Sequence, residues 1–155
     1  MFYKIKKLKI FFQFIIAKKV IIGSGETKIS GWLSTSKRNL DVSNKYHFKK
    51  YWRKNTISNF LAEHVWEHMD ESDRHNANKN CLDYLKPGGK LRIAVPDGFH
   101  PSKDYIDKVR PGGFGAGAKD HKILFNYKIL KNELENAGFI VELLEYWDDS
   151  NNFNF

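Results

Sequence analysis

Cysteine is almost absent from this chain of 155 residues, which contains Cys81 alone. A single cysteine permits no internal disulfide, so a reducing, cytoplasmic setting is expected. Acidic residues are scarce at the start: residues 1–54 hold 14 Lys and Arg against two acids, whereas residues 55–155 hold 12 against 16. This basic half leaves nucleic acid open as a partner, although neither a zinc-finger spacing nor an aromatic-basic RNA-binding signature accompanies it.

Long hydrophobic runs are also missing. The most apolar stretch of the basic half, residues 10–17, contains Gln13 and is far shorter than the ~20 residues of a spanning helix. No small-residue cleavage site follows it, so a signal peptide is not expected. Residues 1–18 alternate lysines with apolar residues at helical spacing, which predicts a basic amphipathic segment that packs on the domain. Peripheral contact of this segment with an anionic membrane stays open.

The remaining residues predict one domain, residues 19–148, followed by a polar tail at 149–155. Internal repeats and low-complexity linkers are absent, and short strand-like and helix-like segments alternate. The predicted strands are residues 19–22, 32–35, 39–42, 59–62, 91–95 and 140–144, and the predicted helices are residues 46–54, 70–85 and 126–137. Such alternation favours a parallel α/β sheet with helices on both faces, which binds ligands beyond the carboxyl ends of its strands.

Three segments occur in a meaningful order: VIIGSGETKISGWLSTS at 20–36, NTISNFLAEHVWEHM at 55–69 and NCLDYLKPGGKLRIAVPD at 80–97. They resemble three parts of class I S-adenosylmethionine (SAM)-dependent methyltransferases. The first segment resembles their first strand, glycine loop and second strand, the second segment their fourth strand, and the third segment the PGG turn and fifth strand. The set is most similar to a small bacterial group of predicted methyltransferases. The resemblance implies a somewhat trimmed, three-layer Rossmann-like sheet with helices on both faces.

The same resemblance implies SAM as cofactor and a small-molecule or sugar hydroxyl as methyl acceptor. Its glycine loop falls on Gly23, Ser24 and Gly25, where glycine lets the backbone approach a ligand closely. Ser36 stands where the family generally has an acid that grips both ribose hydroxyls. A serine makes one uncharged hydrogen bond there, so the cofactor contact would be weaker.

Two acids complete the implied cofactor contacts. Asp41 resembles the residue that often reads the adenine edge, although an aspartate at this position is equally typical of a turn. Glu63 falls at the end of the predicted fourth strand of the family, and either Glu63 or the histidine after it could meet the cofactor.

The pattern H-x-x-E-H at residues 64–68 is also that of an inverted zinc-protease helix. If residues 59–62 form a strand, residues 63–69 are the turn after it, and His64 and His68 are not held one helical turn apart. No convincing distant third ligand accompanies them, so no metal is expected. His64, His68 and His121 are instead candidate catalytic residues, because an unperturbed histidine titrates near neutral pH.

Two other functions stay open beside the methyltransferase. A catalytically inactive, methyltransferase-like binding module would explain Ser36, and a zinc-dependent hydrolase would use the H-x-x-E-H pattern. The glycine-rich residues 98–121 predict a lid loop over the site. The oligomeric state does not follow from the sequence.

Overall fold

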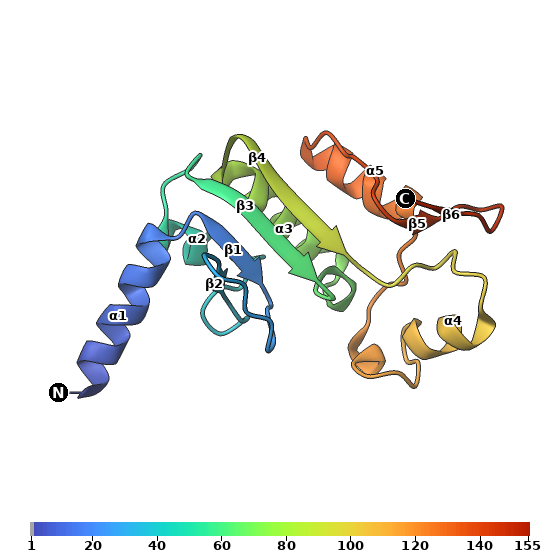
Figure 1. Cartoon of the computed structure of the whole chain (residues 1–155), viewed down its shortest axis with the longest axis horizontal. Coiled ribbons are helices and arrows are strands. Elements are labelled where there is room, and N and C mark those ends of the chain that lie inside the picture. The colour runs from blue at the N-terminus through green and yellow to red at the C-terminus, as the bar shows by residue number, and fades with distance from the viewer. Residues whose placement is uncertain (1) are drawn as a thin grey trace. The chain divides into compact units, whose positions relative to one another are not determined.

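The computed structural model describes residues 2–155, with side chains for residues 8, 9 and 11–155. The chain forms two units (Figure 1). The first contains the residues up to Glu63 together with Asn76–Ile93, and the second contains His64–His75 and Ala94–Phe155.

The first unit is built on a sheet of four parallel strands in the order β2-β1-β3-β4 (Figure 1). The strands are β1 (Lys19–Ile22), β2 (Leu33–Ser34), β3 (Ile57–Glu63) and β4 (Leu85–Ala94). Ile21 of β1 lies opposite Ser34 of β2 on one side and Leu61 of β3 on the other. The β-branched run of β1 is buried from Val20 to Ile22, as a central parallel strand requires.

Helices flank this sheet, which confirms the predicted Rossmann-like α/β class. They are α1 (Phe2–Ile16), α2 (Lys45–Tyr51) and α3 (Glu71–Tyr84), of which α3 begins in the second unit. Phe48 of α2 is fully buried, and its ring centre lies 5.0 Å from that of Tyr84 and 6.0 Å from that of Phe60. These aromatic contacts join α2 to both α3 and β3. Among the described residues, each helix is too short or too polar to cross a bilayer.

Two predictions within the first unit were wrong in detail. Residues 39–42 form turns rather than a strand, because Asp41 Oδ1 accepts hydrogen bonds from the backbone and hydroxyl of Ser43 and competes with strand pairing. Strand β4 begins at Leu85, before the PGG turn, rather than at residue 91. A Cβ on Gly89 would lie 3.0 Å from the Ser58 carbonyl oxygen, so only glycine fits where β4 approaches β3.

The second unit consists of short helices and one hairpin. Its elements are η1 (Trp66–His68), α4 (Lys103–Val109), η2 (Ala118–Asp120), α5 (Tyr127–Ala137), β5 (Tyr146–Trp147) and β6 (Phe153–Asn154). The predicted helix over residues 126–137 is confirmed: the Asn126 side chain accepts a hydrogen bond from the Ile129 N–H at the start, and Gly138 ends it with φ 105°.

Two further predictions fail in this unit. Residues 140–144 are not a strand, since pairing occurs instead between β5 and β6, whose turn is closed by the Asp148 carboxylate accepting from the Ser150 and Asn152 N–H groups. Residues 98–121 are not a plain loop but contain α4 and η2. The Ser102 side chain caps α4 by accepting from the Tyr105 N–H, a local signal that supports the helix.

Candidate functional site

The carboxyl ends of the parallel strands in the first unit meet at one edge of the sheet. Gly23 follows β1, Ser36 lies two residues beyond β2, and Glu63 is the last residue of β3. A backbone hydrogen bond of 2.8 Å from Ser24 N to Thr35 O joins the loop after β1 to the loop after β2. The structure therefore brings together most of the predicted cofactor residues.

The glycine loop has the backbone that its sequence requires. Gly23 and Gly25 take left-handed conformations, with φ of 60° and 53°. A Cβ placed on Gly25 would meet none of the described residues within 4 Å, so the space above it is open. The loop thus turns sharply at the end of β1 and leaves room for a ligand against its backbone, which fits the implied cofactor.

Ser36 and Asp41 fit the cofactor less well. Ser36 is exposed, and its backbone N–H donates to Asn39 Oδ1 at 2.8 Å, so the position supplies a hydroxyl and no carboxylate. Asp41 Oδ1 is taken by two hydrogen bonds from Ser43, and the Asp41 N–H donates to His47 Nδ1 at 2.8 Å. Asp41 is therefore a turn-forming residue in this structure.

Glu63 lies exposed at the end of β3 and accepts a hydrogen bond of 3.1 Å from Arg92 Nη1. Both side chains of this pair are about half exposed, at 44% and 49%. The pair is therefore a surface interaction of small energy, and Glu63 can exchange Arg92 for another partner at little cost.

His64 has an unusual backbone and a buried partner. It is joined directly to the end of β3, its φ is 54°, and its N–H donates to Ala94 O at 2.9 Å. Its ring Nδ1 lies 3.1 Å from Glu67 Oε1. The His64 side chain is 67% exposed and the Glu67 side chain only 1%, so a buried carboxylate orients an accessible imidazole. A left-handed non-glycine residue is a common sign of a functional position.

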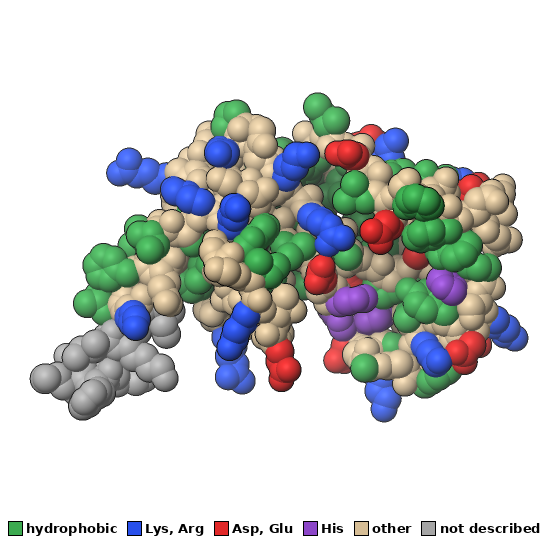
Figure 2. Space-filling model, viewed as in Figure 1, with side chains coloured by type: hydrophobic (Ala, Val, Ile, Leu, Met, Phe, Trp, Pro, Cys, Tyr) green, Lys and Arg blue, Asp and Glu red, His purple; other side chains and the backbone are tan. Residues whose placement is uncertain are grey.

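His68 and His121 lie together in the second unit and contact each other, whereas the His64 ring contacts Glu67. Their ring centres are 4.7 Å apart with an interplanar angle of 81°. Figure 2 shows a group of histidine side chains on the viewed face and a smaller histidine patch apart from it. Glu67, His68 and His121 each offer a ligand atom within 4.8 Å of the other two. The segment from Trp66 to His68 is a short 3-10 helix, so the prediction that these residues are not mid-helix is confirmed.

Glu67 is the residue that sequence reasoning missed. The acid was considered only as part of a zinc-protease pattern, yet it is completely buried, with His64 at its Oε1 and with His68 and His121 close by. The available signal was its position next to Trp66, in a turn rich in apolar and aromatic residues.

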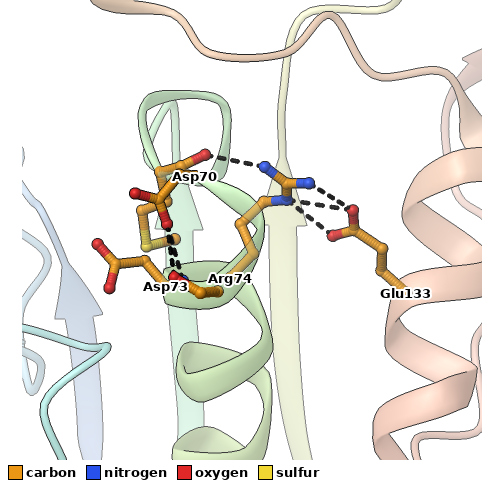
Figure 3. A network of polar contacts seen from close by, with 6 residues as sticks. Asp70, Asp73, Arg74 and Glu133 are labelled. Atoms are coloured by element: carbon orange, nitrogen blue, oxygen red, sulfur yellow. Dashed lines mark hydrogen bonds and ion pairs between the residues drawn. The ribbon is translucent and has the colours of Figure 1, made fainter.

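An ion pair supports the turn that carries these side chains (Figure 3). Arg74 Nε and Nη2 donate to the Glu133 carboxylate, at 2.8–3.1 Å, and Arg74 Nη1 donates to the Met69 carbonyl at 2.9 Å. Asp70 caps α3 by accepting from the Asp73 N–H, and this hydrogen bond holds the pKa of Asp70 below its ordinary value. Hydrogen bonds to Met69 and Asp70 therefore fix the end of the turn and the start of α3.

Burial shifts the pKa of Tyr105 and of Cys81. Desolvation raises the pKa of Tyr105, whose hydroxyl accepts a hydrogen bond of 3.3 Å from the Asp97 N–H. Burial also raises the pKa of the Cys81 thiol far above its ordinary value, and Cys81 lies wholly within the core. A thiol kept protonated in this way is a packing residue and not a nucleophile.

Comparison with known proteins supports the fold by structure and not by sequence. No protein-family model matches the chain, and no curated protein matches its sequence. A crystal structure of a SAM-dependent methyltransferase from Archaeoglobus fulgidus is similar to it, with a TM-score of 0.56 and 14% sequence identity. The similarity covers 90% of this chain and 68% of that one. At this identity the likeness shows the fold, a Rossmann-like sheet; the resemblance to one small bacterial group stays a prediction.

Proposed function

We propose that this protein is a SAM-dependent methyltransferase whose acceptor is a hydroxyl of a small molecule or sugar. The observation that carries the proposal is the open glycine loop at the carboxyl edge of a parallel sheet, in a chain whose fold is similar to that of a SAM-dependent methyltransferase. The sites of ligands in such sheets lie at this edge. A cytoplasmic location belongs to the same proposal and rests on the single cysteine.

The cofactor contacts would come from the loops after β1, β2 and β3. The backbone of the Gly23–Gly25 loop would lie against the cofactor. The Ser36 hydroxyl and the Glu63 carboxylate would supply hydrogen bonds at the neighbouring strand ends. Asp41 would contribute through the oxygen that its turn does not use. When bound, SAM supplies a methyl group already activated on a sulfonium, so the protein needs only to bind, align and accept a proton.

His64 is the residue we assign as the base. Its Nδ1 faces the buried carboxylate of Glu67, which leaves Nε2 as the ring nitrogen available to an acceptor hydroxyl. Glu67 would stabilise the positive charge that the ring gains on taking the hydroxyl proton. In the chain, His64 directly follows Glu63, the last residue of β3.

The test is calorimetric titration of S-adenosylhomocysteine into the full chain. We expect micromolar binding by the natural sequence. Gly25→Asn should weaken binding at least tenfold, because its side chain fills the open space while asparagine tolerates the left-handed backbone. Gly88→Asn is the matched control, since Gly88 also has positive φ (72°) and open space but lies in the PGG turn.

The second candidate is a catalytically inactive module of the same fold. It is favoured by Ser36, an exposed serine where a carboxylate would grip the ribose, and by the commitment of Asp41 Oδ1 to a turn. Charge-assisted hydrogen bonds lost at such a position are worth about 1.5–3 kcal/mol each. Absence of S-adenosylhomocysteine binding at high protein concentration would reject the enzyme and leave this module.

A further inference from the structure

Three side chains of the second unit converge without any role in binding the cofactor. Ligand atoms of Glu67, His68 and His121 all lie within 4.8 Å of one another. We propose that these residues form a binding site for one divalent transition metal ion of the zinc type. The site goes beyond the proposed methyl transfer, which does not depend on a metal.

Glu67 supplies the strongest reason for a cation. Its side chain is 1% exposed, and Oε1 faces His64 Nδ1 at 3.1 Å. Its other oxygen, Oε2, is buried and has no hydrogen-bond partner within the described part of the chain. Buried carboxylate oxygens are otherwise almost always satisfied, because burial of an uncompensated charge is very costly. A cation at Oε2 would compensate this carboxylate directly.

His121 is already oriented as a metal ligand. Its Nδ1 lies 2.7 Å from the Val109 carbonyl oxygen, at the end of α4. A carbonyl only accepts hydrogen bonds, so Nδ1 carries the proton and Nε2 carries the lone pair. A histidine ligand commonly donates its second ring N–H to a carbonyl or carboxylate in this way, which fixes its tautomer and ring orientation. His121 is 8% exposed, so water does not compete strongly for its ring.

His68 completes the set. Its ring stands edge-on to that of His121, with ring centres 4.7 Å apart. Ligand atoms bound tetrahedrally to zinc at 2.0–2.1 Å are about 3.4 Å from one another. The present separations therefore need to shrink by roughly 1.4 Å at most, which side-chain torsions can supply without moving the backbone.

The backbone holds the two contributing segments together. Lys122 N donates to Glu67 O at 2.7 Å. Lys122 follows His121 in the chain and Glu67 precedes His68, so this hydrogen bond keeps the two segments side by side. Gly117, with φ 79°, precedes η2 and lies beside the His68 ring, where an added Cβ would be 3.6 Å from His68 Cε1. The site is therefore assembled by main-chain contacts and does not depend on long, flexible side chains.

The donor set selects the class of metal. Two imidazole nitrogens and one carboxylate suit zinc and its neighbours in the first transition row, whereas Mg²⁺ and Ca²⁺ prefer oxygen ligands throughout. Three protein ligands also leave one coordination position for water or another small ligand. The bound ion would occupy Oε2 of Glu67, leave Oε1 facing His64, and tie the turn after β3 to the segment that carries His121.

The experiment uses the full chain after treatment with a chelator, titrated with Zn²⁺ alone and, for a spectrum, with Co²⁺. We expect one ion per chain with submicromolar affinity, and visible Co²⁺ bands typical of four coordination. Glu67→Gln, His68→Gln and His121→Gln should each weaken Zn²⁺ binding at least tenfold. His75→Gln, which changes an exposed histidine of α3 outside the cluster, should bind as the natural sequence does.

Circular dichroism decides whether each variant is folded, and thermal unfolding of the natural sequence gives a second reading. Zn²⁺ should raise its Tm, and Mg²⁺ at the same concentration should not. Absence of Zn²⁺ binding by the folded natural sequence, or binding that survives His121→Gln and His68→Gln, would overturn the proposal. Titration of S-adenosylhomocysteine into the same chelator-treated protein reports the proposed function separately, because the glycine loop contains none of the metal ligands.

Discussion

Arg74 and Glu133 form an ion pair in which two guanidinium nitrogens, Nε and Nη2, donate hydrogen bonds to one carboxylate. Arg74 Nε lies 3.1 and 3.0 Å from the two Glu133 oxygens, and Nη2 lies 2.8 Å from Oε1. The Arg74 side chain is 7% exposed and that of Glu133 is 22% exposed. The guanidinium carbon also lies 5.5 Å from the ring centre of Phe125, which is fully buried. This pair joins α3 to α5 within the second unit.

Replacing Arg74 with alanine should lower the free energy of unfolding by about 2–3 kcal/mol, because Glu133 and the Met69 carbonyl lose their donors where solvent access is limited. Urea unfolding measures the change. Lys131→Ala is the control, since it removes an exposed partner 3.8 Å from Glu135 and should cost less than about 0.5 kcal/mol. Equal effects of the two substitutions would show that the burial of Arg74 contributes nothing.

Loss of the proposed base should separate catalysis from cofactor binding. His64→Ala should reduce methyl transfer to a hydroxyl acceptor by roughly 10²–10⁴-fold, the usual contribution of a general base. The affinity for S-adenosylhomocysteine should stay unchanged, because His64 is assigned no contact with the cofactor. A screen of hydroxyl acceptors with radiolabelled SAM supplies the activity, and a variant as active as the natural sequence would remove His64 from this role.

The stability contributed by Asp70 should disappear in acid. Its pKa is lowered, chiefly by the hydrogen bond from the Asp73 N–H, so its contribution is fully present above its unfolded pKa and is lost as pH falls through its folded pKa. Asp70→Asn keeps a capping side chain without the charge. The Tm of the natural sequence should exceed that of the variant at pH 7, and the difference should shrink below about pH 4. A difference that does not change with pH would contradict this account.

Cys81 should resist modification in the folded protein. Burial raises its thiol pKa and excludes reagents, so a disulfide reagent at pH 8 should not label it over minutes in the native state. Labelling should be rapid and stoichiometric in 6 M urea. Fast labelling of the native chain would mean that α3 opens readily, because Cys81 faces the core from that helix.

Local signals account for the elements that the sequence predicted correctly. The β-branched run at Val20–Ile22, the glycines after it, and the Asn126 cap with Gly138 at the end of α5 each depend on residues a few positions apart. Such patterns report backbone preferences directly. The edge of the sheet and its glycine loop could therefore be predicted from the chain alone.

The errors fall where distant residues decide. Residues 140–144 have the composition of a strand, but a strand needs a partner, and the available partner pairs with Tyr146–Trp147 instead. Glu67 and His121 could not be joined from the sequence, since their proximity depends on a backbone hydrogen bond between Lys122 and Glu67 in a loop without periodicity. For the same reason the sequence alone did not point to a distant ligand beside His68.

The left-handed backbone of His64 lowers the stability of the fold at a residue to which we assign a role in activity. A side chain with a Cβ costs roughly 1–2 kcal/mol in this conformation, a penalty that glycine avoids. Selection for a more stable protein, with no demand on its chemistry, would therefore replace His64 with glycine. A histidine kept there despite its strain is what an enzyme under functional selection would retain.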